Sequence, residues 1–251
     1  MESEMLQKAR QYEAKRRPEL KGELPVFHVT GGVGWINDPN GFAPYQGEYH
    51  LFFQYYPYDI QWGPMHWGHV KTRDFIRWDF LPAALAPDAE YDKDGCFSGG
   101  AVEMPDGRHL LLYTGVSKKQ REDGSEGEFQ TQCVAIGDGV NYEKYPLNPV
   151  ISTEDIPEGG NTRDFRDPKI WREIGKYYTV DSNRGRMTAV ISCSTRAKMD
   201  CNGSMTASSP PAGTGTENVG VPGLLFPARK GHSDLQRHME KYDPVLEETE
   251  S

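Results

Sequence analysis

The sequence has no stretch of about eighteen consecutive apolar residues, so no segment is expected to cross a bilayer as a helix. It also lacks an excess of basic residues: 28 Lys and Arg against 37 Asp and Glu give a net charge of −9. This balance disfavours nucleic acids and anionic membrane surfaces as partners. The opening segment, MESEMLQKARQYEAKRR, contains no apolar signal core, so the expectation is an unprocessed, cytoplasmic protein.

Cysteine is scarce and unpatterned. The four residues Cys96, Cys133, Cys193 and Cys201 form no C-x-x-C pair. That spacing disfavours both a zinc site and a disulfide framework. Free thiols in a reducing compartment are therefore predicted.

The chain divides into three stretches, and the first two have a readable pattern. Residues 4–17 favour a short charged helix that Pro18 ends. From residue 25 to 186, short apolar or alternating runs are separated by the turn signals DPNG, PDG, GDG and SNRG. The clearest runs lie at 49–56, 68–72, 110–115, 132–137 and 176–182.

Short strands without helices between them predict an all-β sandwich, barrel or propeller. Aromatic-rich segments such as DFIRWDFLP fit the repeated strands of a propeller. After Arg186 the alternation stops, and residues 200–220 contain few large apolar side chains. Taken at face value, residues 187–251 form an irregular or disordered tail.

One cluster of polar residues, GWINDPNG at 34–41, allows two interpretations. D-P-N-G alone is close to an ideal β-turn, and a lone occurrence would be interpreted so. However, FFQYY, QWGPMHWGH, FSGG and RDP follow it, each placing polar groups beside aromatic ones. Aromatic faces with a few aimed hydrogen-bonding groups suit a small neutral polyol.

Five segments together, WINDPNG, FFQYYP, WGPMHWGH, DKDGCFSGG and FRDPK, resemble the signatures of glycoside hydrolase family 32, which includes invertases and sucrose-6-phosphate hydrolases. The resemblance runs from about Leu6 to Arg186. It implies a five-bladed β-propeller, usually followed by a β-sandwich. This chain would hold an incomplete propeller at 25–186, preceded by a helix and linker at 1–24.

The resemblance also assigns roles. Asp38 would be the nucleophile, and Asp167 would hold sugar hydroxyls and stabilise the transition state. His66 and Cys96 are interpreted as packed structural residues. The positions that match the family's substrate contacts are Trp35, Ile36, Asn37, Gln54, Trp62, Phe97, Ser98 and Arg166.

These residue types suit the cleavage of a β-fructofuranoside such as sucrose. A carboxylate can trap the oxocarbenium-like centre as a covalent fructosyl-enzyme, while a second carboxyl group protonates the leaving oxygen and then activates water. No metal or cofactor is expected, because these groups suffice. Without its context, Asp167 beside Arg166 could equally be a structural ion pair.

The family's acid/base glutamate lies in a W-E-C-P-like motif downstream of R-D-P, and no such motif occurs in these 251 residues. Read in other frames, the codons for 187–208 permit DGSDQLLYASKDGLQWEYDGIL, and those for 219–226 permit WECPDFF. We therefore hypothesise frame errors after Arg186, with a genuine disordered tail as the alternative. DNA sequence across codons 180–260 would decide between them.

A chain without its general acid is predicted to be inactive or poorly folded as written. Two further hypotheses stay open: a sucrose-binding protein that has lost catalysis, and a fructosyltransferase. The sequence does not distinguish sucrose from sucrose-6-phosphate or fructan as the substrate. It also leaves the oligomeric state unknown.

Overall fold

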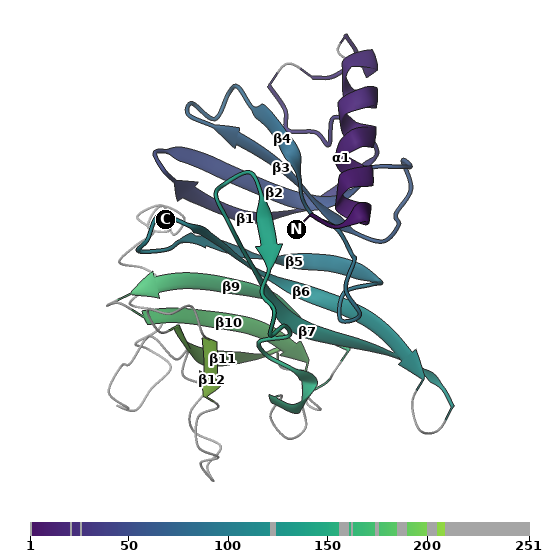
Figure 1. Ribbon diagram of the computed structural model, residues 1–251. Helices are drawn as coiled ribbons and strands as arrows, with labels where there is room; N and C mark the ends of the chain where they lie inside the picture. Colours follow the sequence, from purple (N-terminus) through teal and green to yellow (C-terminus); the bar gives the residue numbers. More distant parts are fainter. Residues whose placement is uncertain are drawn as a thin grey trace, which may run out of the picture.

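In the computed structural model, the described residues form three antiparallel sheets of four strands each (Figure 1). The structure describes residues 2–20, 22–25, 27–120, 124–155, 161, 163–173, 176–184, 190–199 and 205–208. The first sheet holds β1 (Trp35–Tyr45), β2 (Glu48–Tyr56), β3 (His66–Thr72) and β4 (Asp79–Leu85). The second holds β5 (Gly95–Glu103), β6 (His109–Gln120), β7 (Glu126–Gly137) and β8 (Tyr142–Lys144). The third holds β9 (Phe165–Glu173), β10 (Lys176–Arg184), β11 (Val190–Met199) and β12 (Met205–Ser208).

Within each sheet the strands follow chain order, so every strand pairs with the next one along the sequence. The first strand of each sheet therefore lies at a sheet edge, and β5 contacts both β1 and β9. Successive sheets thus meet through their first strands. This arrangement confirms the all-β prediction, while the five-blade count stays a prediction.

The α-helix α1 (Glu4–Arg16) packs against β4 (Figure 1). Ser3 caps it by accepting a hydrogen bond from the Leu6 amide at 3.2 Å, and a 3₁₀ turn (Arg17–Leu20) follows. These bounds confirm the helix predicted at 4–17. No helix among the described residues is both long enough and apolar enough to cross a membrane.

Two side chains of α1 bind the backbone of one residue in β4. The Arg10 Nε donates to the Ala83 carbonyl at 2.9 Å, and Glu13 accepts from the Ala83 amide at 3.0 Å. Because β4 ends the first sheet, these groups would otherwise lack a strand partner. The helix therefore closes part of this sheet edge.

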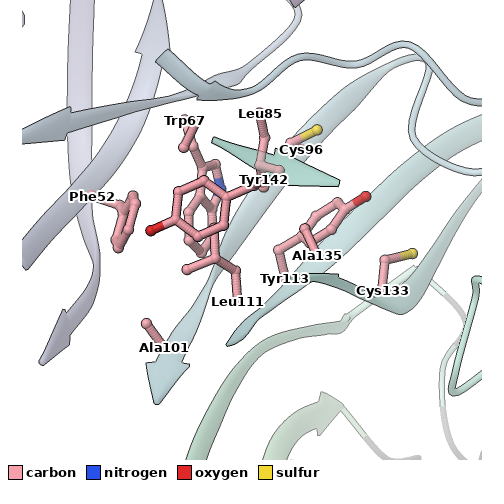
Figure 2. Close-up of a cluster of buried hydrophobic side chains, with 11 residues drawn as sticks. Phe52, Trp67, Leu85, Cys96, Ala101, Leu111, Tyr113, Cys133, Ala135 and Tyr142 are labelled. Atoms are coloured by element: carbon pink, nitrogen blue, oxygen red, sulfur yellow. The ribbon is translucent and has the colours of Figure 1, made fainter. Parts of the chain in front are cut away.

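Alternation within β2 places apolar residues on both faces of the first sheet. One face of β2 contributes to a core against the second sheet, and the opposite face packs under α1. Figure 2 shows the first of these cores, where Phe52 and Trp67 meet Leu111 and Tyr142. A third core joins the second and third sheets through Leu110, Leu112, Val134, Ile170 and Tyr177.

Cys96 and Cys133 are buried free thiols, as predicted. The side chains of Cys193 and Cys201 lie outside the described residues.

Two sequence predictions require correction. DPNG is not a turn: Asp38–Gly41 lies within β1, and the register shifts on either side show an irregular strand instead. The region expected to be irregular after residue 186 contains β11 and β12. The remaining residues of 187–251 lie outside the described part of the chain.

Candidate active site

Asp38 lies near the start of β1, in a stretch where the strand does not keep its register. The pairing of β1 with β2 shifts between Ile36 and Pro39 and again between Asn40 and Ala43. A bulge of this kind turns side chains away from regular alternation, and Asp38 is exposed.

The structure requires a glycine at position 41, the end of the WINDPNG segment. Its φ is +51°, and a Cβ atom there would lie 2.9 Å from the Phe52 ring and 3.0 Å from the Ala101 Cβ. The first and second sheets approach each other closely at this point. Glycine is thus required both by the backbone conformation and by the lack of space.

Ser98 brings the second sheet to Asp38. It occupies a register shift of β5, between Phe97 and Gly99, and its hydroxyl donates to Asp38 Oδ2 at 3.4 Å. A hydroxyl donor at that position can stabilise a carboxylate. The FSGG segment of the second sheet therefore contacts the WINDPNG segment of the first.

Asp167 brings the third sheet to the same place. It lies near the start of β9 with φ +61°, and its amide donates to Thr114 Oγ1 at 3.1 Å. Partial burial raises the pKa of its carboxyl group, the Arg166 guanidinium opposes that shift, and the nearby charge of Asp38 adds to it. The charge of Asp38 therefore acts on the Asp167 carboxyl group, although 129 positions (167 − 38) separate the two residues in the sequence.

Arg166 lies between two carboxylates. Its Nε is 3.6 Å from Asp167 Oδ2, and its Nη1 is 3.1 Å from Asp164 Oδ1. The ion pair that the sequence left as an alternative is therefore present. It does not exclude a role in the site, because half of the Asp167 side chain remains exposed.

Aromatic residues accompany these carboxylates. Trp62 is 56% exposed and meets Phe97 edge to face, with ring centroids 6.4 Å apart. The indole of Trp35 donates to Asn37 Oδ1 at 2.7 Å. Exposed indole rings are suitable surfaces for the apolar face of a sugar.

Other predicted residues lie deeper. Gln54 is buried, and its amide nitrogen donates to the Cys96 carbonyl at 3.0 Å, next to Phe97. Ile36 packs against the apolar cluster under α1. His66 is buried with Nδ1 2.9 Å from the Pro64 carbonyl, and burial lowers its pKa to about 4, which fits a structural residue.

Sequence reasoning missed Thr114 and Gln132, which are buried on the neighbouring strands β6 and β7. Their side chains contact each other, and both bind the backbone around Asp167. The available signal was a polar residue inside each of the apolar runs LLLYTG and QCVAIG.

Comparison with known proteins agrees with this geometry. The glycosyl hydrolases family 32 N-terminal domain matches residues 28–198. The chain belongs to this family. The matched range ends within β11, beyond the domain boundary predicted at residue 186. The hypothesis of frame errors after Arg186 concerns the coding DNA and stays a prediction.

Similar family 32 proteins include a sucrose-6-phosphate hydrolase of Zymomonas mobilis, 45% identical over 157 residues, which are 62% of this chain and 29% of that protein. A raffinose invertase of Escherichia coli is 42% identical over 159 residues, covering 62% and 31%. The chain therefore spans less than a third of the length of these curated relatives.

Solved structures give the same result. A β-fructofuranosidase of Bombyx mori superposes with a TM-score of 0.64 at 37% identity, covering 80% of this chain and 41% of that one. A variant of that enzyme in complex with sucrose gives a TM-score of 0.66 at 36% identity, covering 83% and 42%.

Proposed function

We propose that this chain supplies the nucleophile and the transition-state-stabilising carboxylate of a retaining β-fructofuranosidase. The observation that carries the proposal is that Asp38 raises the pKa of Asp167 from a different sheet, while Ser98 and Thr114 of the second sheet bind the Asp38 side chain and the Asp167 amide. Ser98, from the sheet between them, contacts Asp38. The proposal thus assigns residues from three sheets to one site.

In the proposed reaction, Asp38 attacks the anomeric carbon of the fructosyl unit. The bond to the leaving oxygen breaks as an acid/base carboxyl group protonates that oxygen, and a covalent fructosyl-enzyme forms. The same carboxyl group, now ionised, takes a proton from water, which attacks the intermediate and releases fructose. Asp167 would bind sugar hydroxyls and stabilise the positive charge that develops on the ring.

The substrate class follows from the relatives. The matched proteins are named for hydrolysis of sucrose-6-phosphate or for invertase activity, and the Bombyx mori variant was solved with sucrose. We therefore propose sucrose or its 6-phosphate as the substrate. The aromatic pair Trp62 and Phe97 would bind the apolar side of the sugar.

The acid/base group is proposed to come from outside the described residues. The 251 residues contain no W-E-C-P-like motif, so the chain as printed is expected to be inactive. Restoring the reading frame after Arg186 would supply the motif.

The test is to express the printed chain and the frame-restored protein and to measure the reducing sugar released from sucrose and from sucrose-6-phosphate. Hydrolysis by the restored protein alone is expected. In that protein, Asp38→Asn should lower kcat by about 10⁴-fold or more, as for other removed nucleophiles. Asp79→Asn is the matched control, because Asp79 is an exposed aspartate at the far edge of the same sheet.

Three outcomes would contradict the proposal. Full turnover by the printed chain would remove the need for a further carboxyl group. Sucrose binding without hydrolysis by the restored protein would assign a non-catalytic binding role. Predominant transfer of fructose to sugar acceptors would identify a fructosyltransferase.

A further inference from the structure

We infer that Thr114 and Gln132 are positioning residues that hold the two site carboxylates in a fixed relation. This inference rests on the proposed roles of Asp38 and Asp167. The hydrogen bonds of Thr114 and Gln132 link these side chains to each other and to the backbone of Ser98, Phe165 and Asp167. They act on the backbone that carries the site.

Asp167 needs such support because of its backbone conformation. Its φ of +61° lies in the left-handed region, which residues other than glycine seldom adopt. Gln46 and Phe75 share this feature, but both lie between strands, whereas Asp167 lies inside β9. A strained residue within a strand persists only where its surroundings fix it.

Regular strand pairing does not provide that support. The pairing of β9 with β10 shifts register between Val180 and Ser182, and Asp167 lies opposite this shift. The Asp167 amide instead donates to Thr114 Oγ1 on β6 at 3.1 Å. A side chain from the second sheet thus replaces a backbone partner from the third.

The Thr114 hydroxyl connects the segments that carry both carboxylates. While accepting from Asp167, it can donate its single proton to the Ser98 carbonyl at 3.2 Å or to Gln132 Oε1 at 3.1 Å. Ser98 in turn contacts Asp38 through its own hydroxyl. One buried hydroxyl therefore lies between the Asp167 backbone and the Ser98 backbone.

Gln132 fixes the other side of this network. Its amide nitrogen donates to the Phe165 carbonyl at 2.9 Å, two residues before Asp167. That bond orients the side-chain oxygen toward Thr114, which lies directly opposite Gln132 across β6 and β7. Thr114 and Gln132 have no exposed surface, so water does not compete for these bonds.

The experiment uses the isotope-labelled 251-residue chain and two NMR observables that need no catalysis. One is the pKa of the Asp167 carboxyl group from its carbon shift, and the other is hydrogen exchange of the Asp167 amide. Thr114→Val removes the hydroxyl at nearly constant volume, Thr114→Ser keeps it, and Gln132→Met removes the amide. Thr131→Val is the matched control, because Thr131 neighbours Gln132 but its hydroxyl contacts Cys133.

In Thr114→Val, Asp167 should move into solvent and away from Asp38. We expect its pKa to fall toward the ordinary value by about half a unit or more. Its amide should exchange about tenfold faster or more, because the protecting acceptor is lost. Thr114→Ser should match wild type in both observables, as should Thr131→Val, whereas Gln132→Met should shift both in the direction of Thr114→Val.

Unchanged pKa and exchange in a folded Thr114→Val chain would overturn the inference. Loss of folding in both Thr114→Val and Gln132→Met would also overturn it and assign the pair to the scaffold. Sucrose titration of the frame-restored protein separates this result from the proposed function. If that protein does not bind sucrose, the proposed fructoside-cleaving function fails. The NMR comparison still decides whether Thr114 and Gln132 position Asp167.

Discussion

In each sheet the first strand pairs irregularly with the second, and among the other described strand pairs a register shift occurs only between β3 and β4, from Trp67 to His69. β6 and β7 pair along all twelve residues from His109 to Gln120 without a register shift. β1, β5 and β9 each contain shifts where they pair with the next strand. Asp38, Ser98 and Asp167 all lie within such shifts.

This difference separates two tasks within one fold. Regular strands bury alternate side chains and carry the apolar cores, whereas a shift redirects a side chain that alternation would have buried. Asp38, Ser98 and Asp167 are accordingly at least partly exposed, whereas Gln54 on β2 and Thr114 on β6 are buried. Changes in the regular strands should therefore reduce stability, while changes in the shifted strands should affect the site.

The largest effect is expected from Phe52→Ala in β2. Phe52 is fully buried and stacks on His69, with ring centroids 4.1 Å apart. Deletion of such a ring should lower the free energy of unfolding by about 3–5 kcal/mol. Urea denaturation measures this change. Phe42→Ala in β1 is the control, because Phe42 is 49% exposed and its loss should cost less than about 1 kcal/mol. Equal losses in the free energy of unfolding for the two variants would contradict the proposal that regular strands carry stability and shifted strands carry the site.

A second prediction concerns acid. His50 and His69 contact each other at 2.9 Å in the core, and His109 lies 2.8 Å from the Tyr142 hydroxyl. Burial lowers the pKa of all three histidines, that of His109 to about 3. Below the ordinary histidine pKa of about 6.5, the unfolded chain therefore binds protons that the folded chain excludes.

Stability should consequently fall as the pH drops below about 6.5, and for His109 this fall should continue toward pH 3 at up to about 1.4 kcal/mol per pH unit. Denaturation at several pH values gives the slope. His109→Gln should reduce it, whereas His28→Gln, at an exposed position, should leave it unchanged. A wild-type slope that neither substitution alters would show that other groups cause the acid sensitivity.

The third prediction tests the closure of the sheet edge by α1. Glu13→Ala leaves the Ala83 amide without its acceptor and removes a partner of Arg17, 3.2 Å away. We expect a loss of about 1–3 kcal/mol in the free energy of unfolding. Gln11→Ala, at an exposed position of the same helix, should change it by less than about 0.5 kcal/mol. Equal effects would mean that Glu13 contributes only as a surface residue.

Much of the regular structure could be predicted from the sequence because alternation reports burial directly. The runs at 49–56 and 110–115 lie within β2 and β6, and the helix begins at Glu4 as expected. The family motifs drew attention to Asp38 and Asp167, and the charge of Asp38 raises the pKa of Asp167 in the structure.

What escaped prediction depends on contacts between sheets. D-P-N-G has the composition of a turn, but in the structure it is part of strand β1. Gly41 lies there against Ala101 of the second sheet, and a contact between sheets leaves no local pattern in the sequence. Thr114 and Gln132 form no motif, since their role depends on a shift in β9. The burial of Glu13 was hidden because its partner, Ala83, lies seventy positions away (83 − 13).

The smallest expected effect is that of Asp167→Gly in β9, which should stabilise the protein, whereas the preceding changes should destabilise it. Asp167→Gly should relieve the strain of the left-handed backbone at φ +61°, which raises the free energy of unfolding by about 1–2 kcal/mol. Glycine also increases the entropy of the unfolded chain, which lowers the free energy of unfolding by about 0.4–1 kcal/mol. A net stabilisation of about 0.5–1 kcal/mol is expected, together with loss of sucrose binding by the frame-restored protein. Gln46→Gly, at φ +48° in the β1–β2 turn, should give a similar gain and keep sucrose binding. If Asp167→Gly destabilised the protein instead, Asp167 would be part of the scaffold, and the shifted strands would not be specialised for the site.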